Sequence, residues 1–181
     1  KGYDGNATAT LNTSLINYGG LVSGDTLTGS YSGVFLAGKD VGANKTVTIT
    51  SVYGGADLDN YTITDQTSTV ADITKRALVL STFSASDKIY DGNNTATTSS
   101  SISGYVGSET INHSLTATFD NKNVGSSKAV TVNSITLTDG TNGGLAANYS
   151  LSTGQTTTAN ITPKTLTASA SASNKTYDGT T

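Results

Sequence analysis

The pentapeptide Lys88-Ile89-Tyr90-Asp91-Gly92 has two close copies in this chain of 181 residues. One copy, Lys1-Gly2-Tyr3-Asp4-Gly5, begins the sequence, and the other, Lys175-Thr176-Tyr177-Asp178-Gly179, lies near its end. The tyrosines of successive copies are 87 residues apart. That spacing is typical of a small domain and is much longer than the repeat of most solenoids. The sequence therefore predicts a tandem array of whole domains.

Further segments recur in the same order between the pentapeptides. Lys39-Asp40-Val41-Gly42 corresponds to Lys122-Asn123-Val124-Gly125, and Asn60-Tyr61 corresponds to Asn148-Tyr149. The other matched segments are 22–26 with 107–110, 45–49 with 128–132, and 72–75 with 160–164. With the pentapeptide they make six matches in the same order, which chance does not easily give.

These matches place boundaries after Lys75 and Pro163. Residues 1–75, the first unit, lack an opening strand, and residues 76–163, the second unit, form a complete repeat. Residues 164–181, the C-terminal segment, correspond to the opening strand of a third repeat. We expect a fragment of a longer protein, in which the C-terminal segment supplies the strand missing from the first unit of a neighbouring molecule by β-augmentation. The alternative is that this segment packs back onto its own chain.

Composition and alternation predict the fold class. Only 34% of the residues are hydrophobic and 13% are charged, and Thr and Val suit a pleated, half-buried surface. Apolar residues alternate with Thr in 45–53 and with polar residues in 128–137, the period of a strand. We expect an all-β protein of tandem small antiparallel domains, sandwich or β-grasp-like, that form an elongated rod. The other predicted strands are 7–17, 25–36, 59–65, 68–74, 76–84, 94–105, 109–119, 148–153, 156–162 and 164–172.

Several classes of protein are excluded or disfavoured by the composition. With no Cys there is no disulfide framework and no thiolate metal site. The net charge is −3 without a basic cluster, so we expect no nucleic-acid partner. No apolar run approaches the length of a membrane span. The one histidine, His113, has no counterpart in the first unit, and no P-loop or dinucleotide-binding glycine pattern occurs. We therefore expect no enzymatic activity and no catalytic residue.

Together, these motifs resemble the YDG repeat domain, a relative of the mostly-β MBG repeats of large bacterial adhesins and filamentous-haemagglutinin-like exoproteins. The resemblance covers the whole chain, with one longer loop at 138–144 in place of 54–59. It implies secretion, display on a bacterial cell surface, and a stalk-like or adhesive role of the kind found in biofilms. Its partners would be neighbouring repeats of the same chain.

Each recurring motif has a structural interpretation and a functional alternative. Asp-Gly favours a tight turn in which the carboxylate accepts backbone N–H groups, and Tyr can bury its ring while its hydroxyl stays hydrogen-bonded. We expect structural roles for the motif residues Tyr3, Asp4, Gly5, Tyr90, Asp91, Gly92, Tyr177, Asp178, Gly179, Lys39, Lys122, Tyr61 and Tyr149. The alternative for the tyrosines is a ligand site.

Three other chemistries remain alternatives at this stage. We expect no cofactor, although the carboxylates of Asp57 and Asp59 in a Gly-rich loop leave calcium open. Lys39 and Lys122 recur in register, so a Lys–Asn or Lys–Asp cross-link is an alternative to an exposed lysine. Thr-rich strand faces and the Asn-x-Ser/Thr sequons leave glycan contacts and glycosylation open.

The repetition favours an extended spacer or stalk, since each added copy lengthens a rod, whereas a catalytic site needs building only once. The alternative is an adhesive module that binds a glycan or a protein of a host or partner cell directly. The sequence names no such ligand.

Overall fold

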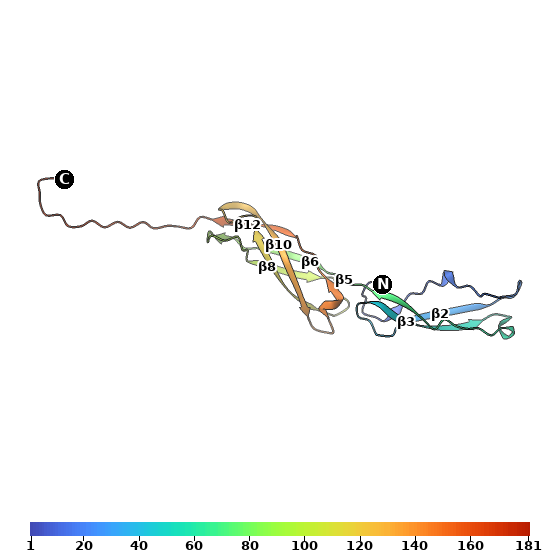
Figure 1. The fold of residues 1–181 in the computed structure, drawn as a ribbon. Helices are drawn as coiled ribbons and strands as arrows, with labels where there is room; N and C mark the ends of the chain where they lie inside the picture. The colour runs from blue at the N-terminus through green and yellow to red at the C-terminus, as the bar shows by residue number, and fades with distance from the viewer.

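The computed structural model describes residues 1–181, apart from the side chain of Leu15. It confirms the predicted mostly-β class: strands dominate, and the helical elements described are three short 3₁₀ turns, η1 (Thr13–Leu15), η2 (Leu58–Asn60) and η3 (Ala146–Asn148). None of the described helices is long or apolar enough to cross a membrane. In Figure 1 the strands of the two units form separate groups, and the C-terminal segment extends away from the second group.

The first unit forms one antiparallel sheet in the order β1-β2-β3-β4. Its strands are β1 (Thr8–Ala9), β2 (Thr28–Phe35), β3 (Gly42–Gly54) and β4 (Ser68–Ile73). Phe35, Val47 and Ile73 point to one face and are almost completely buried. Thr46 and Thr48, on the other face of β3, are exposed. This is the alternation that the Thr-rich pattern of 45–53 predicts.

The second unit has a four-stranded sheet in the order β7-β12-β10-β9. Its strands are β7 (Lys88–Ile89), β9 (Ile111–Phe119), β10 (Gly125–Asp139) and β12 (Thr156–Thr162). Two further pairs, β6 (Val79–Ala85) with β8 (Thr98–Ser103) and β5 (Arg76–Ala77) with β11 (Tyr149–Ser150), complete the unit. The pairs β7–β12 and β5–β11 are parallel, so the predicted antiparallel pairing holds for the longer strands and not for these two.

The two units have the same irregularity in their long central strands, β3 and β10. Both long strands have a register shift just after their first residue, and the residues in it, Asn44 and Ser127, each have φ of 50°. The Asn44 N–H donates to Asp72 Oδ1 at 2.7 Å, and the Ser127 N–H donates to Asn160 Oδ1 at 2.8 Å. The repeated sequence thus repeats a β-bulge at the same place.

Two predicted strands of the first unit were wrong. Segment 59–65 contains only η2 and coil, and most of 7–17 is coil and η1 beyond the two residues of β1. In the second unit the corresponding strands, β11 and β8, pair with β5 and β6. Among the described residues no strand pairs with these two segments, so their N–H and C=O groups lack the partners that β5 and β6 provide in the second unit. For 148–153, only Tyr149–Ser150 is a strand.

The C-terminal segment also departs from prediction. No strand forms at 164–172, and every residue from 164 to 181 is exposed. The alternative that this segment packs back onto its own chain is therefore wrong. The segment has the alternation of a strand, but a strand forms only when a neighbouring strand bonds to it, and no described strand of its own chain pairs with this segment.

Candidate functional site

The three Tyr-Asp-Gly motifs form the same turn. In each, the Asp Oδ1 accepts the backbone N–H two residues further on, at 3.1 Å for Asp4 and Asp91 and 3.0 Å for Asp178. The following glycine has φ between 77° and 85°, which favours a residue without Cβ. A Cβ on Gly5 would also lie 2.6 Å from Val106 Cγ1 of the second unit. Asp-Gly is therefore a turn element at each repeat.

The lysine that opens each pentapeptide completes this turn. Lys1, Lys88 and Lys175 each place Nζ 2.7–2.9 Å from the motif carboxylate three residues on. Hydrogen bonds with this lysine are the largest cause of the lowered pKa of Asp4 and Asp91. Sequence reasoning gave this lysine no role, although its recurrence in all three copies indicated one.

The motif tyrosines differ in what covers them. Tyr3 is 1% exposed, Tyr90 is half-buried and Tyr177 is 94% exposed. The turn is the same in all three copies, so it does not bury the tyrosine by itself. Burial follows from the contacts that each tyrosine makes outside its own pentapeptide.

Tyr3 is buried because the first unit meets the second there. Its hydroxyl donates to Glu109 Oε1 at 2.7 Å, and Lys39 Nζ donates to the same oxygen at 3.0 Å. Lys39 also donates to the Tyr3 hydroxyl and lies 5.0 Å from the centre of the Tyr3 ring. The Glu109 side chain is only 10% exposed. An acidic side chain of the second unit is thereby bound by two residues of the first.

Asn148 and Tyr149 of the second unit complete this cluster. The Tyr149 hydroxyl donates to Glu109 Oε2 at 2.7 Å, so both carboxylate oxygens have donors. Asn148, 1% exposed, accepts the Val41 N–H at 2.9 Å and donates to Asp40 Oδ1 at 2.8 Å. The recurring segments 39–42 of one unit and 148–149 of the next therefore bind each other. We call the set Tyr3, Lys39, Asp40, Val41, Glu109, Asn148 and Tyr149 the junction.

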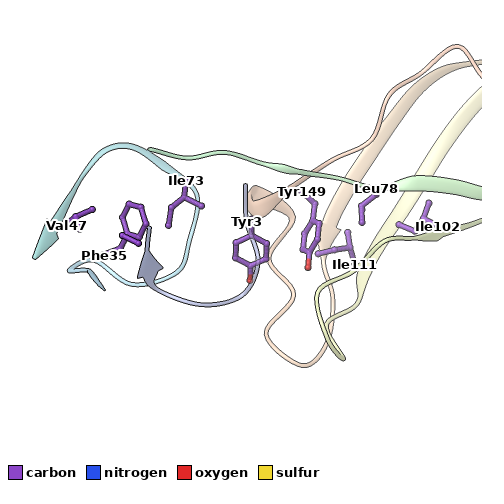
Figure 2. Close-up of a cluster of buried hydrophobic side chains, with 9 residues drawn as sticks. Tyr3, Phe35, Val47, Ile73, Leu78, Ile102, Ile111 and Tyr149 are labelled. Carbon is purple, nitrogen blue, oxygen red and sulfur yellow. The ribbon is translucent and has the colours of Figure 1, made fainter. Parts of the chain in front are cut away.

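Apolar packing continues through the junction. The Tyr3 and Tyr149 rings pack edge to face with centres 5.5 Å apart. Figure 2 shows these two rings in the middle of one cluster. First-unit residues Phe35, Val47 and Ile73 lie on one side of them, and second-unit residues Leu78, Ile102 and Ile111 lie on the other. The two units thus share a hydrophobic core, which restrains their relative movement far more than a single linker would.

The hydrogen bonds of the junction set its protonation states. Burial raises the pKa of the Glu109 carboxyl, but hydrogen bonds from Tyr149, Tyr3 and Lys39 outweigh burial and hold that pKa below its ordinary value. Burial and the hydrogen bond to Glu109 raise the pKa of Tyr149 to about 12. Hydrogen bonds to Tyr3 and Glu109 raise the pKa of Lys39. At neutral pH the cluster therefore holds a carboxylate, an ammonium group and two neutral phenols.

These shifts predict how stability depends on pH. Because the folded-state pKa of Glu109 is lowered, its contribution is present above the ordinary value of 4.5 and is lost as pH falls through the lower folded value. Because the folded-state pKa of Tyr149 is raised, its contribution is complete below 10 and is lost as pH rises through about 12. Urea unfolding across this range should show both losses. In Tyr149→Phe the alkaline loss should be smaller, and an unchanged alkaline slope would contradict this assignment.

Each unit also has, at the end away from the junction, copies of the junction residues that the other unit contributes. These copies have no second unit packed against them in this structure. In the first unit the Tyr61 hydroxyl donates to Asp25 Oδ2 at 2.6 Å and accepts the Val22 N–H at 3.0 Å. Tyr149, Glu109 and Val106 make the same pair of bonds, at 2.7 and 3.1 Å. At the far end of the second unit, Tyr90 is half-buried and Lys122 is exposed. The structure therefore brings Tyr3, Lys39 and Tyr149 together but leaves Tyr61, Tyr90, Lys122 and the Tyr177 copy apart.

Sequence reasoning missed Glu109, the central residue of the junction. The alignment that matches Thr26 with Thr110 also matches Asp25 with Glu109, so both units have an acidic residue at this position. That recurrence was the signal in the sequence that could have identified Glu109. Its partner could not be inferred in the same way, since Lys39 lies 70 residues away in the other unit.

The remaining candidates from the sequence are the calcium loop, the histidine and the lysine cross-link. Asp57 Oδ2 accepts the Thr26 N–H at 2.8 Å. Among the described residues, no group of three or more His, Asp or Glu side chains is placed to hold a metal ion. His113 Nε2 lies 2.8 Å from Ser100 Oγ, on neighbouring strand pairs of the second unit. Of the two lysines considered for a cross-link, Lys39 forms an ion pair with Glu109 in the junction. Lys122, the counterpart of Lys39 in the second unit, is exposed.

Comparison with known proteins agrees with the repeat. A family model described as the YDG domain matches residues 1–69 and again residues 74–159. A search of curated proteins and a search of solved structures each return no match. The two matched stretches cover most of the chain and contain both halves of the junction. The chain belongs to the YDG domain family.

Proposed function

We propose that the two units are stiffly joined spacer modules in the stalk of a secreted protein displayed on a bacterial cell surface. The supporting observation is the junction, in which a 10%-exposed carboxylate of one unit is bound by a lysine and a tyrosine of the other. A spacer needs its repeats to hold a fixed direction relative to one another. A shared core with a hydrogen-bonded ion pair at its centre provides that, whereas a flexible linker between separate cores does not.

The arrangement of the junction supports a serial array. Segments 39–42 of the first unit and 148–149 of the second both recur in the other unit, so every unit has both binding faces at opposite ends. Such head-to-tail contacts extend a chain of units in one direction. The elongated rod, the adhesin context of filamentous-haemagglutinin-like exoproteins and the absence of a catalytic or cofactor role are parts of this proposal.

Small-angle X-ray scattering of the chain, at a concentration where it is monomeric, tests the spacer role. The proposal predicts a pair-distance distribution with a long tail and a cross-section of one unit. A compact, symmetric distribution would contradict it. Direct binding of a glycan or of a host or partner-cell protein is the competing function. A glycan array and a surface-protein panel probed with the same chain would favour that function if saturable binding appeared.

A further inference from the structure

The first unit contains an open groove of about 760 Å³. It runs between the inner face of the sheet and the segments 11–21 and 61–66, which overlap the two predicted strands, 7–17 and 59–65, that did not form as predicted. Its apolar lining comes from Leu11, Ile16, Leu27, Ile49, Tyr53 and Ile63. Ile16 is 40% exposed, and the others are only half-buried. A β-unit with a half-buried inner face lacks the layer that should cover it.

The second unit shows what covers the same face. There β5 and β6 pair with β11 and β8, the counterparts of 61–62 and 11–17. Leu78, between β5 and β6, is 5% exposed and packs with Ile102 and Ile111. Under this layer Val132 is 2% exposed, whereas Ile49, its counterpart in the first unit, is only half-buried and lines the groove. In this chain the groove therefore corresponds in position to the layer that β5 and β6 form in the second unit.

The C-terminal segment has the sequence of such a strand. Lys164-Thr165-Leu166 follows Ile161-Thr162-Pro163 as Arg76-Ala77-Leu78 follows Ile73-Thr74-Lys75. Beyond Leu166, Ala168, Ala170 and Ala172 alternate with Thr and Ser, which gives one apolar face at a period of two. Leu166 is 87% exposed, and the hydrogen bonds described within this segment are local ones between 175 and 180.

The sizes of the side chains in segment and groove are complementary. Where β6 has Leu80 and Phe83, the segment has the smaller Ala168 and Ala170. The groove compensates with larger side chains. By strand register, Tyr31 and Tyr53 of the first unit stand where the second unit has Leu115 and Leu137. Small residues on the strand thus oppose large ones in the groove, as close packing requires.

The residues at the two outer ends of the molecule are also chemically complementary. A segment lying in the groove of another copy would bring the outer end of that copy's first unit against the outer end of this second unit. Asp25 and Tyr61 would then face Tyr90 and Lys122, the same chemistry that joins Glu109 and Tyr149 to Tyr3 and Lys39. An exposed lysine meets an acid, and a half-buried tyrosine meets another tyrosine.

We propose that residues 164–172 of one copy dock as a β-strand in the first-unit groove of a second copy, so that the chain associates head to tail. The strand would bond to 61–62 at its start, as the Leu78 N–H bonds to Ser150 O at 2.7 Å in the second unit, and then to 11–17. Because the donor and acceptor surfaces differ, the contact does not close and extends to further copies. This association is separate from the spacer role and stands or falls independently of it.

Sedimentation equilibrium over a wide range of protein concentration tests the proposal. The weight-average mass of the 18.3 kDa chain should rise with concentration. Removal of 164–181, which touches no other part of the fold, should leave a monomer at every concentration. Leu166→Asp should also abolish association, because it places a charge on the apolar face. Thr167→Asp is the matched control: its side chain points away from the groove, so association should persist.

A labelled peptide of residues 163–173 provides a second readout. It should bind the chain that lacks 164–181 with one saturable site, and the same peptide with Leu166→Asp should not. The proposal is overturned if the full chain stays monomeric at all concentrations, if the chain lacking 164–181 associates equally well, or if the peptide fails to bind. Circular dichroism of each variant confirms that the units remain folded.

Discussion

Replacing Glu109 with Ala is expected to weaken the junction more than any other change of a single polar residue. The substitution leaves the Tyr3 and Tyr149 hydroxyls and the Lys39 ammonium group without their shared acceptor. Breaking a buried ion pair costs about 3–5 kcal/mol. The Lys39 side chain is 35% exposed and can turn to water, so we expect a smaller loss in unfolding free energy, roughly 2–3 kcal/mol.

Asp25→Ala is the matched control for this prediction. Asp25 is the counterpart of Glu109 and accepts the Tyr61 hydroxyl in the same way, but it has no second unit against it. Its loss should cost only about 1 kcal/mol, the net contribution of one hydrogen bond. Both variants are compared by urea unfolding at neutral pH. Equal losses for the two would mean that Glu109 acts only within its own unit and that the junction adds no stability.

The second large effect is expected for Phe119→Ala. Phe119 is 1% exposed and packs with Val130, Ala159 and Ile161 in a cluster confined to the second unit. Truncating a buried aromatic residue costs about 3–5 kcal/mol, a large fraction of the 5–15 kcal/mol that stabilises a typical domain. We expect the second unit to unfold at much lower urea concentration, detected by hydrogen exchange of the amides of β10 and β12.

Phe35→Ala distinguishes the core that spans the junction from the core confined to the second unit. Phe35 is the counterpart of Phe119 but belongs to the cluster that continues through the junction to Leu78 and Ile111. Its truncation should therefore accelerate exchange in the first unit and also at the junction side of the second. Phe119→Leu, which keeps most of the apolar volume, should cost much less than Phe119→Ala. A loss below about 1 kcal/mol for Phe119→Ala would contradict the packing described for this core.

The strands that sequence predicted well are those whose partners lie in the same unit. Alternation marked 45–53 and 128–137 because β3 and β10 have one buried and one exposed face, and both pair with strands close in sequence. Segments 59–65 and 164–172 have similar alternation but formed no strand. Alternation records which side of a segment is apolar, whereas strand formation also needs a free edge beside it.

The junction was harder to predict than the fold. Tyr3, Lys39 and Tyr149 were singled out because they recur, but recurrence does not say which copy meets which. Their common partner is Glu109, whose counterpart in the first unit is Asp25, so the acidic character recurs but the residue type does not. The contact between Lys39 and Glu109 spans two units, so no local pattern of spacing could reveal it. Recurring residues of opposite charge at opposite ends of a repeat are the feature to look for in such arrays.

The junction is expected to hold the two units in one fixed orientation, which a distance measurement between the units tests directly. The chain has no cysteine, so Thr50→Cys with Thr136→Cys places spin labels only on exposed positions of β3 and β10. Double electron–electron resonance should give a single narrow distance distribution, about as narrow as that of a control pair within the second unit, Ser99→Cys with Thr136→Cys. A broad distribution, as for domains on a flexible linker, would show that the junction does not fix the orientation of the two units.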